Sequence, residues 1–314
     1  MDQAIFWDFA KACLPLLTLI GMGAAARRWL LKDDQVWAGV NRLNFFVLIP
    51  ALVLATLVRA DLLAIPGLSI IFTILLALFA LIAMLVLYYR LAVPGSMDLP
   101  AYTSLFQTTT RWNGAMALAV AGLAFEDTAV TVIAIVMVAV VPFVNGLNVG
   151  MMVRLLSGDT PSIKKLSFAV LTNPIVVGAL MGIVLSLTRA PLPEFAIQSL
   201  EMLRASAIGS ILLALGAGLR ISGFQGRVFA ISFSCFNKLV LMPLLVLLIG
   251  QALGVEPTLL AFVVIALAMP SAANGYVIAS QMGGDAPLYA SCCTTQTLLS
   301  FVTVPLWVLF VFSL

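Results

Sequence analysis

The sequence contains no histidine, and only 9% of its 314 residues are charged. Without histidine there is no imidazole to ligate a metal, to activate a serine or cysteine nucleophile, or to relay a proton. The net charge of +3 is too small to favour nucleic acid as a partner. The four cysteines lie in apolar stretches without metal-site spacing, which favours buried packing over a disulfide or redox role. These absences exclude most of the familiar hydrolytic chemistry.

The sequence is instead rich in hydrophobic residues, which make up 63% of it and give a mean hydropathy of +1.16. A helix needs about 20 apolar residues to span a bilayer. Such stretches recur along the whole chain and leave no room for a soluble domain. We predict an all-α membrane protein with ten transmembrane helices, near residues 5–26, 36–58, 68–88, 99–122, 128–150, 167–187, 195–217, 228–250, 258–281 and 287–312.

Basic residues are unevenly distributed between the two sets of connections that alternate along the chain. One set contains Arg27, Arg28, Lys32, Arg90, Arg154, Lys164, Lys165, Arg220 and Arg227. The other set contains only Arg59 and Arg189. Because cytoplasmic connections carry the excess of Lys and Arg, and because ten spans place both ends on one side, we expect both termini outside the cell (inner) membrane. The first apolar stretch is expected to be retained as a helix, since its basic residues follow it.

Several residues recur at a nearly constant offset, which indicates an internal duplication. Pro15, Met22 and Gly23 recur 159 residues later as Pro174, Met181 and Gly182; Asn113-Gly114 recurs 161 residues later as Asn274-Gly275; and Pro142 recurs 163 residues later as Pro305. We expect five-helix repeats at 1–150 and 167–314, joined by a cytoplasmic linker at 151–166. An odd number of helices per repeat makes the second copy inverted, the architecture of many alternating-access carriers.

The fourth and ninth predicted spans combine polar residues with residues that interrupt helices. The fourth, which contains Arg111 and Asn113-Gly114, is too polar to face lipid along its length. The ninth places Pro270, Asn274 and Gly275 inside the membrane, where proline and glycine favour an unwound segment. If both helices break and cross at the same depth, they form a site for a small polar solute. The alternative is two ordinary kinks whose asparagines bond neighbouring helices.

Two basic side chains are predicted to lie near mid-membrane, Arg111 in the fourth span and Lys238 in the eighth. No acidic residue lies at comparable depth in the predicted spans. Glu201 and Arg204, three apart near a span end, can pair locally. The uncompensated positive field favours an anionic substrate such as a carboxylate. Alternatively, Lys238 is a structural tether to helix-end carbonyls. The polar face of the tenth span, 291–297, either approaches the crossing or bonds other helices.

The chain resembles the auxin efflux carrier family, of the bile acid/auxin carrier-like superfamily. The likeness is carried by Asn113-Gly114, Asn173-Pro174, Gly178, Gly182, Leu215–Gly218, Lys238, Pro243, Met269–Gly275, Ala279, Gly283-Gly284-Asp285, Thr294–Thr297, Ser300 and Pro305. The resemblance implies a secondary carrier of organic acid anions, such as malonate-like dicarboxylates or indole acids. It also implies a substrate site where spans four and nine cross, and a moving domain of spans three to five and eight to ten. The chain departs from the family in lacking a proline shortly after Asn113.

We therefore expect a non-enzymatic carrier of small organic anions that works by alternating access, in an elevator-like manner. We assign the substrate site to Asn113, Gly114, Arg111, Asn274, Gly275, Lys238, Ser271 and Thr294, with Pro270 as a helix break. No cofactor or metal is expected, the coupling ion stays open between proton and sodium, and the partners are the substrate, the bilayer and a second copy in a homodimer. The alternatives are a sodium-coupled symporter of the bile-acid type, a receptor-like bundle and, least favoured without histidine or paired aspartates, an intramembrane enzyme.

Overall fold

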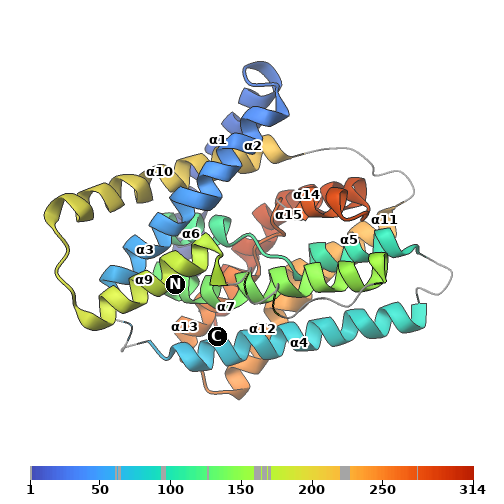
Figure 1. Cartoon of the computed structure of the whole chain (residues 1–314). Helices are drawn as coiled ribbons and strands as arrows, with labels where there is room; N and C mark the ends of the chain where they lie inside the picture. The colour runs from blue at the N-terminus through green and yellow to red at the C-terminus, as the bar shows by residue number, and fades with distance from the viewer. Residues whose placement is uncertain are drawn as a thin grey trace. The chain divides into compact units, whose positions relative to one another are not determined.

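The computed structural model describes residues 2–60, 62, 65–92, 97–125, 127–158, 164, 168, 171–219, 227–273 and 275–314, with side chains from residue 14 onward except at position 92. These residues form helices joined by short connections, and no strand occurs among them (Figure 1). The predicted all-α fold is therefore confirmed. Six described helical segments are long and apolar enough to cross a membrane: Asp34–Arg59, Gly67–Leu91, Asp127–Ser157, Glu194–Gly218, Val228–Ala252 and Ala286–Phe312. Pro174–Thr188 and Pro257–Leu267 are shorter apolar helices.

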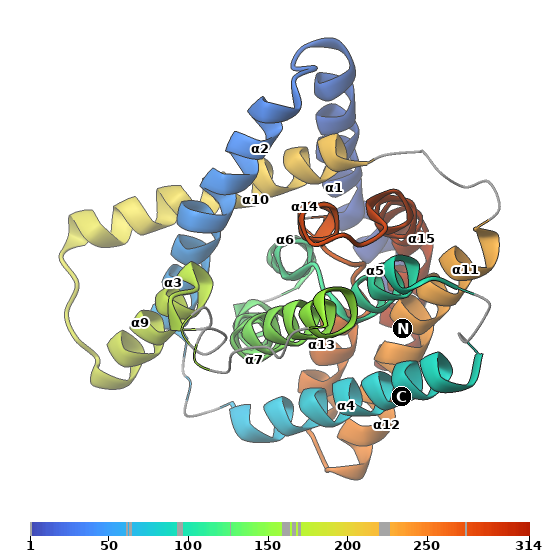
Figure 2. The ribbon, with the colours of Figure 1, turned by 45° about the vertical axis from the view of Figure 1, so that its right-hand side comes forward.

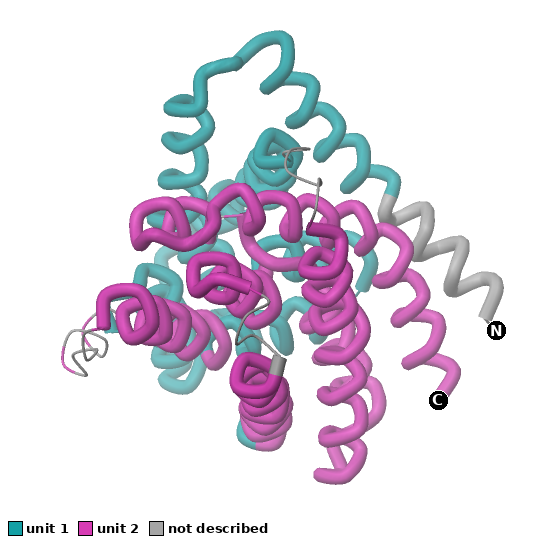
Figure 3. The backbone as a smooth tube through the Cα atoms, turned by 90° about the vertical axis from the view of Figure 1, so that its right-hand side faces the viewer, with its two compact units in different colours: residues 1–68, 114–138, 171–219 teal, residues 69–113, 139–170, 220–314 magenta. Residues whose placement is uncertain are grey.

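The chain divides into two compact units, each built from segments of both halves of the sequence (Figure 3). The first unit comprises residues 1–68, 114–138 and 171–219, and the second comprises 69–113, 139–170 and 220–314. The predicted repeats at 1–150 and 167–314 concern the sequence halves instead, and they stay a prediction.

The first unit is an assembly of helices whose starts follow local capping rules. Its elements are α1 (Asp2–Trp29), α2 (Asp34–Leu43), the π-helical turn η1 (Asn44–Leu48), α3 (Ile49–Arg59), α6 (Gly114–Ala124), the first part of α7 (Asp127–Met152), α9 (Pro174–Thr188) and α10 (Glu194–Gly218). Asp33 caps α2 by accepting from the N–H of Gln35, and Asn173 caps α9 by accepting from that of Ile175. Pro174 then occupies the first turn, where a missing donor costs nothing.

Glycines let the helices of the first unit pack backbone to backbone. A Cβ added to Gly23 on α1 would overlap the backbone of Leu213 on α10, and one added to Gly216 on α10 would overlap the carbonyl of Ile20 on α1. Small residues at such contacts are the usual means by which membrane helices approach closely. The close packing of α1 on α10 therefore depends on these two glycines.

The same kind of contact joins α3 and α9, which lie side by side in Figure 2. A Cβ on Gly178 would lie 2.8 Å from the carbonyl oxygen of Pro50, and one on Gly182 would lie 2.8 Å from Cβ of Leu57 and 3.3 Å from the carbonyl oxygen of Leu54. Two pairs of helices in this unit are thus held together by glycine contacts.

The second unit contains the remaining helices. They are nearly all of α4 (Gly67–Ala92), α5 (Leu99–Thr110), the end of α7, the π-helical turn η2 (Val153–Ser157), α11 (Val228–Phe236), the π-helical turn η3 (Asn237–Leu241), α12 (Met242–Ala252), α13 (Pro257–Leu267), α14 (Gly275–Gln281) and α15 (Ala286–Phe312). An acidic cap followed by a proline in the first turn begins three of them: Asp98 for α5, Glu256 for α13 and Asp285 for α15. Within this unit α5, α11 and α15 pack against one another.

Each of the π-helical turns η1 and η3 is followed by a proline. Pro50 and Pro243 are the second residues of α3 and α12, and neither has an N–H to donate. The wider turn before each proline loosens the ladder, and the N–H of Met242 reaches back to the carbonyl of Asn237. The indole of Trp307 donates to the carbonyl of Leu239 in η3 at 2.8 Å. The eighth span therefore departs from a regular α-helix at η3, the turn that contains Lys238.

Substitution of Gly216 by alanine should destabilise the first unit, because the new methyl group would overlap the backbone of Ile20. We expect a cost of about 1–3 kcal/mol, typical of overpacking, seen as a lower midpoint of thermal unfolding in detergent. Gly209, on the same helix, has nothing within 4 Å of an added Cβ. Gly209→Ala should therefore be neutral or stabilising by up to about 1 kcal/mol, since alanine favours helix. Equal midpoints for the two variants would contradict the close packing.

Candidate functional site

The fourth predicted span is interrupted just after its polar half. Helix α5 ends at Thr110, residues 111–113 are non-helical, and α6 begins at Gly114. Arg111 is extended, with φ −67° and ψ 154°, although its N–H still donates to the carbonyl of Gln107 at 2.8 Å. The three residues of this break are buried, so the backbone groups freed by the break need partners within the protein.

The ninth predicted span is interrupted as well. Helix α13 ends at Leu267 and α14 begins at Gly275, with Pro270 buried in the segment between them. Proline lacks a donor and clashes with the preceding turn, which explains why the helix stops here. Asn274, which we predicted to be a ligand in this segment, lies outside the described residues.

The two breaks contact each other directly within the second unit. The backbone N–H of Asn113 donates to the carbonyl of Pro270 at 2.9 Å. The indole N–H of Trp112 donates to the carbonyl of Ala266, near the end of α13, at 2.5 Å. Each bond joins a donor in the first break to a carbonyl at the second break. In an uninterrupted helix such a carbonyl would accept from the N–H four residues further along. The unwound segments thus satisfy part of each other's backbone.

Helix α15 bonds the second break at Ser271 and Ala272. The N–H of Ser271 donates to Oε1 of Gln296 at 2.9 Å, its carbonyl accepts from the thiol of Cys293 at 3.3 Å, and its hydroxyl lies 3.0 Å from that of Tyr289. The Tyr289 hydroxyl also donates to the carbonyl of Ala272 at 2.6 Å. A Cβ at position 275 would overlap the Tyr289 ring, which explains the glycine there.

Gln296 connects this break to two further helices. Its amide nitrogen donates to the carbonyl of Thr108 on α5 at 3.1 Å and to the hydroxyl of Ser234 on α11 at 2.8 Å. The hydroxyls of Thr108 and Ser234 are themselves 2.8 Å apart. Gln296 has no measurable exposure, so both ends of its amide are used inside the protein. A single buried side chain therefore links α5, α11, α15 and the second break.

Arg111 is oriented by neutral partners. Its Nε donates to Oε1 of Gln107 at 3.0 Å, and Nη1 donates to Oδ1 of Asn145 on α7 at 2.9 Å. Its Nη2 is buried and has no hydrogen-bond partner within the described part of the chain. The residue is 2% exposed. One edge of this guanidinium is therefore held in place while the other is available to a ligand.

Lys238 is the second buried basic side chain, at 1% exposure in η3. Among side chains that the structure describes, Arg111 and Lys238 are the only buried charged ones. The ammonium makes no hydrogen bond or ion pair with the described residues, so they provide no support for the helix-end tether that we considered. Two buried basic side chains, with no buried carboxylate among the described residues, form an environment that favours an anion.

The structure brings several predicted site residues together and adds others. Arg111, Asn113, Pro270 and Ser271 meet at the two breaks, whereas Gly114 opens α6 in the first unit and Thr294 is buried on α15. The predicted site residues did not include several partners: Gln107, Trp112 and Tyr289, which are buried, and Asn145, which is half-buried. Gln296 is buried and belongs to the polar face 291–297, which the sequence analysis left open between the crossing and other helices. Asn145 and Gln296 carried a usable signal, because an amide in an apolar span needs a partner.

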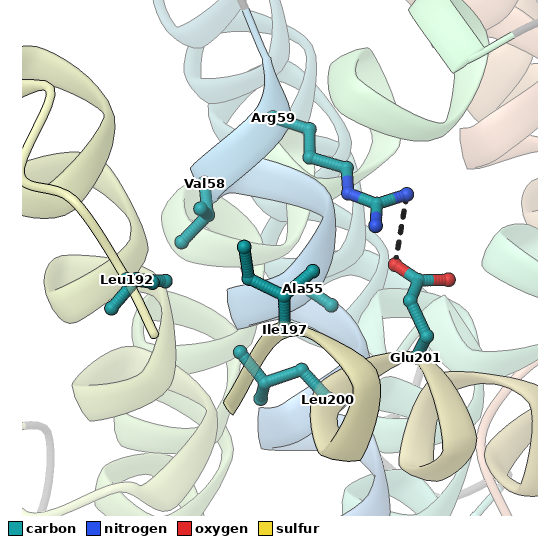
Figure 4. Close-up of a pocket in the computed structure, with 7 residues that line it drawn as sticks. All are labelled: Ala55, Val58, Arg59, Leu192, Ile197, Leu200 and Glu201. Carbon is teal, nitrogen blue, oxygen red and sulfur yellow. Dashed lines mark ion pairs between the residues drawn. The ribbon is translucent and has the colours of Figure 1, made fainter. Parts of the chain in front are cut away.

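A small cavity in the first unit has a different character (Figure 4). Its volume is about 60 Å³, and five of its seven lining residues are apolar. At its edge Arg59 pairs with Glu201 at 3.0 Å, and Glu201 also lies 3.7 Å from Arg204, which confirms the predicted local pair. Arg204 in turn lies 3.6 Å from Asp127. Because the charges at this cavity are paired, it is a poor candidate for a polar solute.

Comparison with known proteins shows that part of this chain is similar to membrane transport proteins. Residues 160–308 match the family described as "Membrane transport protein". Over 136 residues the chain is 28% identical to the "Uncharacterized transporter YfdV" of Escherichia coli K12 and to that of Shigella flexneri. Each alignment covers 43% of this chain and 43% of the relative, so less than half of either protein is compared.

The match confirms, over residues 160–308, the resemblance to the auxin efflux carrier family. Together with the long apolar helices, it identifies a multi-pass membrane protein. The matched range contains the second break, Lys238 and Gln296, but not the first break.

Replacing Gln296 by methionine should loosen the second break, because it leaves the buried N–H of Ser271 without an acceptor. We expect the free energy of unfolding to fall by about 1–3 kcal/mol. Amide hydrogen exchange should be faster in peptides that cover residues 268–276. Thr295→Val is the matched control, because among the described residues the Thr295 hydroxyl bonds only the carbonyl of Ser291 on its own helix. Unchanged exchange in Gln296→Met would contradict the role given to this side chain.

Proposed function

We propose that the protein is a secondary carrier that moves small organic acid anions across the cell (inner) membrane by alternating access. The observation that carries this proposal is the free edge of the buried Arg111 guanidinium, located in a helix break that meets a second break. A guanidinium binds a carboxylate through charge-assisted hydrogen bonds, which are stronger than bonds between neutral groups. The family match supports transport as the activity.

The proposed binding residues are those predicted from the sequence, with one refinement of role. Arg111 and Lys238 supply positive charge, and Asn113 and Asn274 supply side-chain amides to the substrate. Ser271 uses its N–H, carbonyl and hydroxyl in contacts with α15, so we assign it to shaping the break. Gly114, Gly275 and Pro270 permit the interruptions, and Thr294 lines the site from α15.

We further propose that ten transmembrane helices form two inverted five-helix repeats. Supporting this, moving Gly23 forward and Leu213 back by 159 residues gives Gly182 and Leu54, which are also in contact. The packing of α1 on α10 then corresponds to that of α9 on α3, as duplication would produce. The second compact unit contains segments from both sequence halves, which is consistent with an elevator-like moving domain. We also propose that both termini lie outside the cell and that two copies of the protein form a homodimer.

Counterflow of labelled mono- and dicarboxylates in proteoliposomes tests the anion site. Arg111→Met should reduce saturable counterflow by at least about tenfold, the loss expected for removing a charge-assisted bond of about 1.5 kcal/mol or more. Asn113→Ala and Asn274→Ala should also lose flux. Arg90→Met is the control, because Arg90 is an exposed cation at the end of α4.

Flux unaffected by all three site variants would overturn the site. No flux of any acid in the unaltered protein would overturn the organic-anion carrier, and flux that requires sodium would favour the symporter of the bile-acid type.

A further inference from the structure

Lys238 is a titratable group that transport of an anion alone does not require. Arg111 already provides a permanent charge at the breaks, since guanidinium stays protonated in proteins. A lysine amine can hold or release its proton, and burial penalises only the charged form. Lys238 is 1% exposed, and none of the described residues forms a hydrogen bond or ion pair that would compensate an ammonium there. Ionisable residues placed in this way inside membranes commonly mark proton pathways.

The position of Lys238 connects it to the candidate site. It lies one helical turn after Ser234, whose hydroxyl is bonded to Gln296 and Thr108. Long side chains on a helix lean toward its N-terminus, which here is the direction of Ser234. Gln296 in turn holds Ser271 in the second break. Lys238 therefore lies one helical turn from a residue of the network that fixes this break.

The helices packed against η3 offer no permanent counter-charge. These helices are α5, α11, α12 and α15. Their titratable side chains are phenols and thiols only: Tyr102, Cys235, Tyr289, Cys292 and Cys293. The charged residues that cap these helices are Asp98 and Arg111 at the two ends of α5, Arg227 at the start of α11 and Asp285 at the start of α15. Arg227 and Asp285 pair with each other at 2.5 Å. Arg227 is separated from Lys238 by 11 residues, about 16 Å along a helix.

We infer that Lys238 is the proton-coupling site of the carrier, an inference that rests on the proposed anion transport. In the empty carrier the amine is neutral. When a carboxylate enters, the lone pair of Nζ takes up a proton from water, and the ammonium and the carboxylate cross together. On the other side the carboxylate leaves and the proton returns to water. One monoanion therefore moves with one proton, so the pair is electroneutral, and a proton gradient accumulates the acid on the alkaline side.

Proton uptake on substrate binding tests this directly. Purified protein in weakly buffered detergent at pH 8 receives a saturating carboxylate, chosen from those that show counterflow, while a soluble pH indicator reports the protons removed from water. A fully ionised carboxylate brings no proton of its own, so the unaltered protein should take up close to one proton per anion bound. Lys238→Arg and Lys238→Met should take up none. Lys32→Arg, an exposed lysine in a connection, should behave as the unaltered protein.

Transport separates coupling from the carrier activity itself. Lys238→Arg keeps the positive charge, so counterflow without a gradient should persist while accumulation driven by a pH gradient falls at least tenfold. If the larger side chain prevents folding, seen as aggregation on size exclusion, the unaltered protein still decides through its own proton uptake. Anion binding without proton uptake, or sodium-driven accumulation that ignores pH, would overturn the inference and leave the carrier standing. Absence of counterflow for every acid would instead overturn the proposed function.

Discussion

The structure of the second unit depends on one constraint: backbone groups released by a helix break in a dry interior must find partners inside the protein. The two breaks meet this constraint together, since the N–H of Asn113 bonds the carbonyl of Pro270 and the indole of Trp112 bonds that of Ala266. Neither interruption would be satisfied in this way alone. The two interruptions therefore share part of their hydrogen bonding, with the carbonyl of Pro270 accepting from the break in the fourth span.

The second break adds a demand on α15, which is met by side chains spaced along one helical face. Tyr289, Cys293 and Gln296 are separated by four and three residues, so they project from the same side toward Ser271 and Ala272. Because Gln296 also bonds α5 and α11, a displacement of any of these elements disturbs the break. Polar contacts of this kind are directional and give the unwound segment a defined conformation.

Much of this arrangement could be predicted from local chemistry, and the rest required spatial information. Hydropathy reveals apolar helices, and Pro270 with Gly275 marks a break, because these residues act on their own turn of backbone. The bond from Gln296 to Thr108 joins residues 188 apart, and no local rule contains that pairing. Likewise, Gly23 reads as an ordinary small residue until Leu213 is placed against it. The compact units, which draw on both sequence halves, also result from such distant contacts.

The choice of neutral partners for Arg111 bears on what the site can bind. Opposite unit charges about 4 Å apart attract by roughly 4 kcal/mol at an effective dielectric constant near 20. A resident carboxylate beside Arg111 would therefore have to be displaced by an incoming anion. Gln107 and Asn145 instead orient the guanidinium through amide oxygens and leave its net charge intact. Because its partners orient the guanidinium without neutralising it, the positive charge stays available to attract a ligand. This is the arrangement that reversible binding of an anion requires.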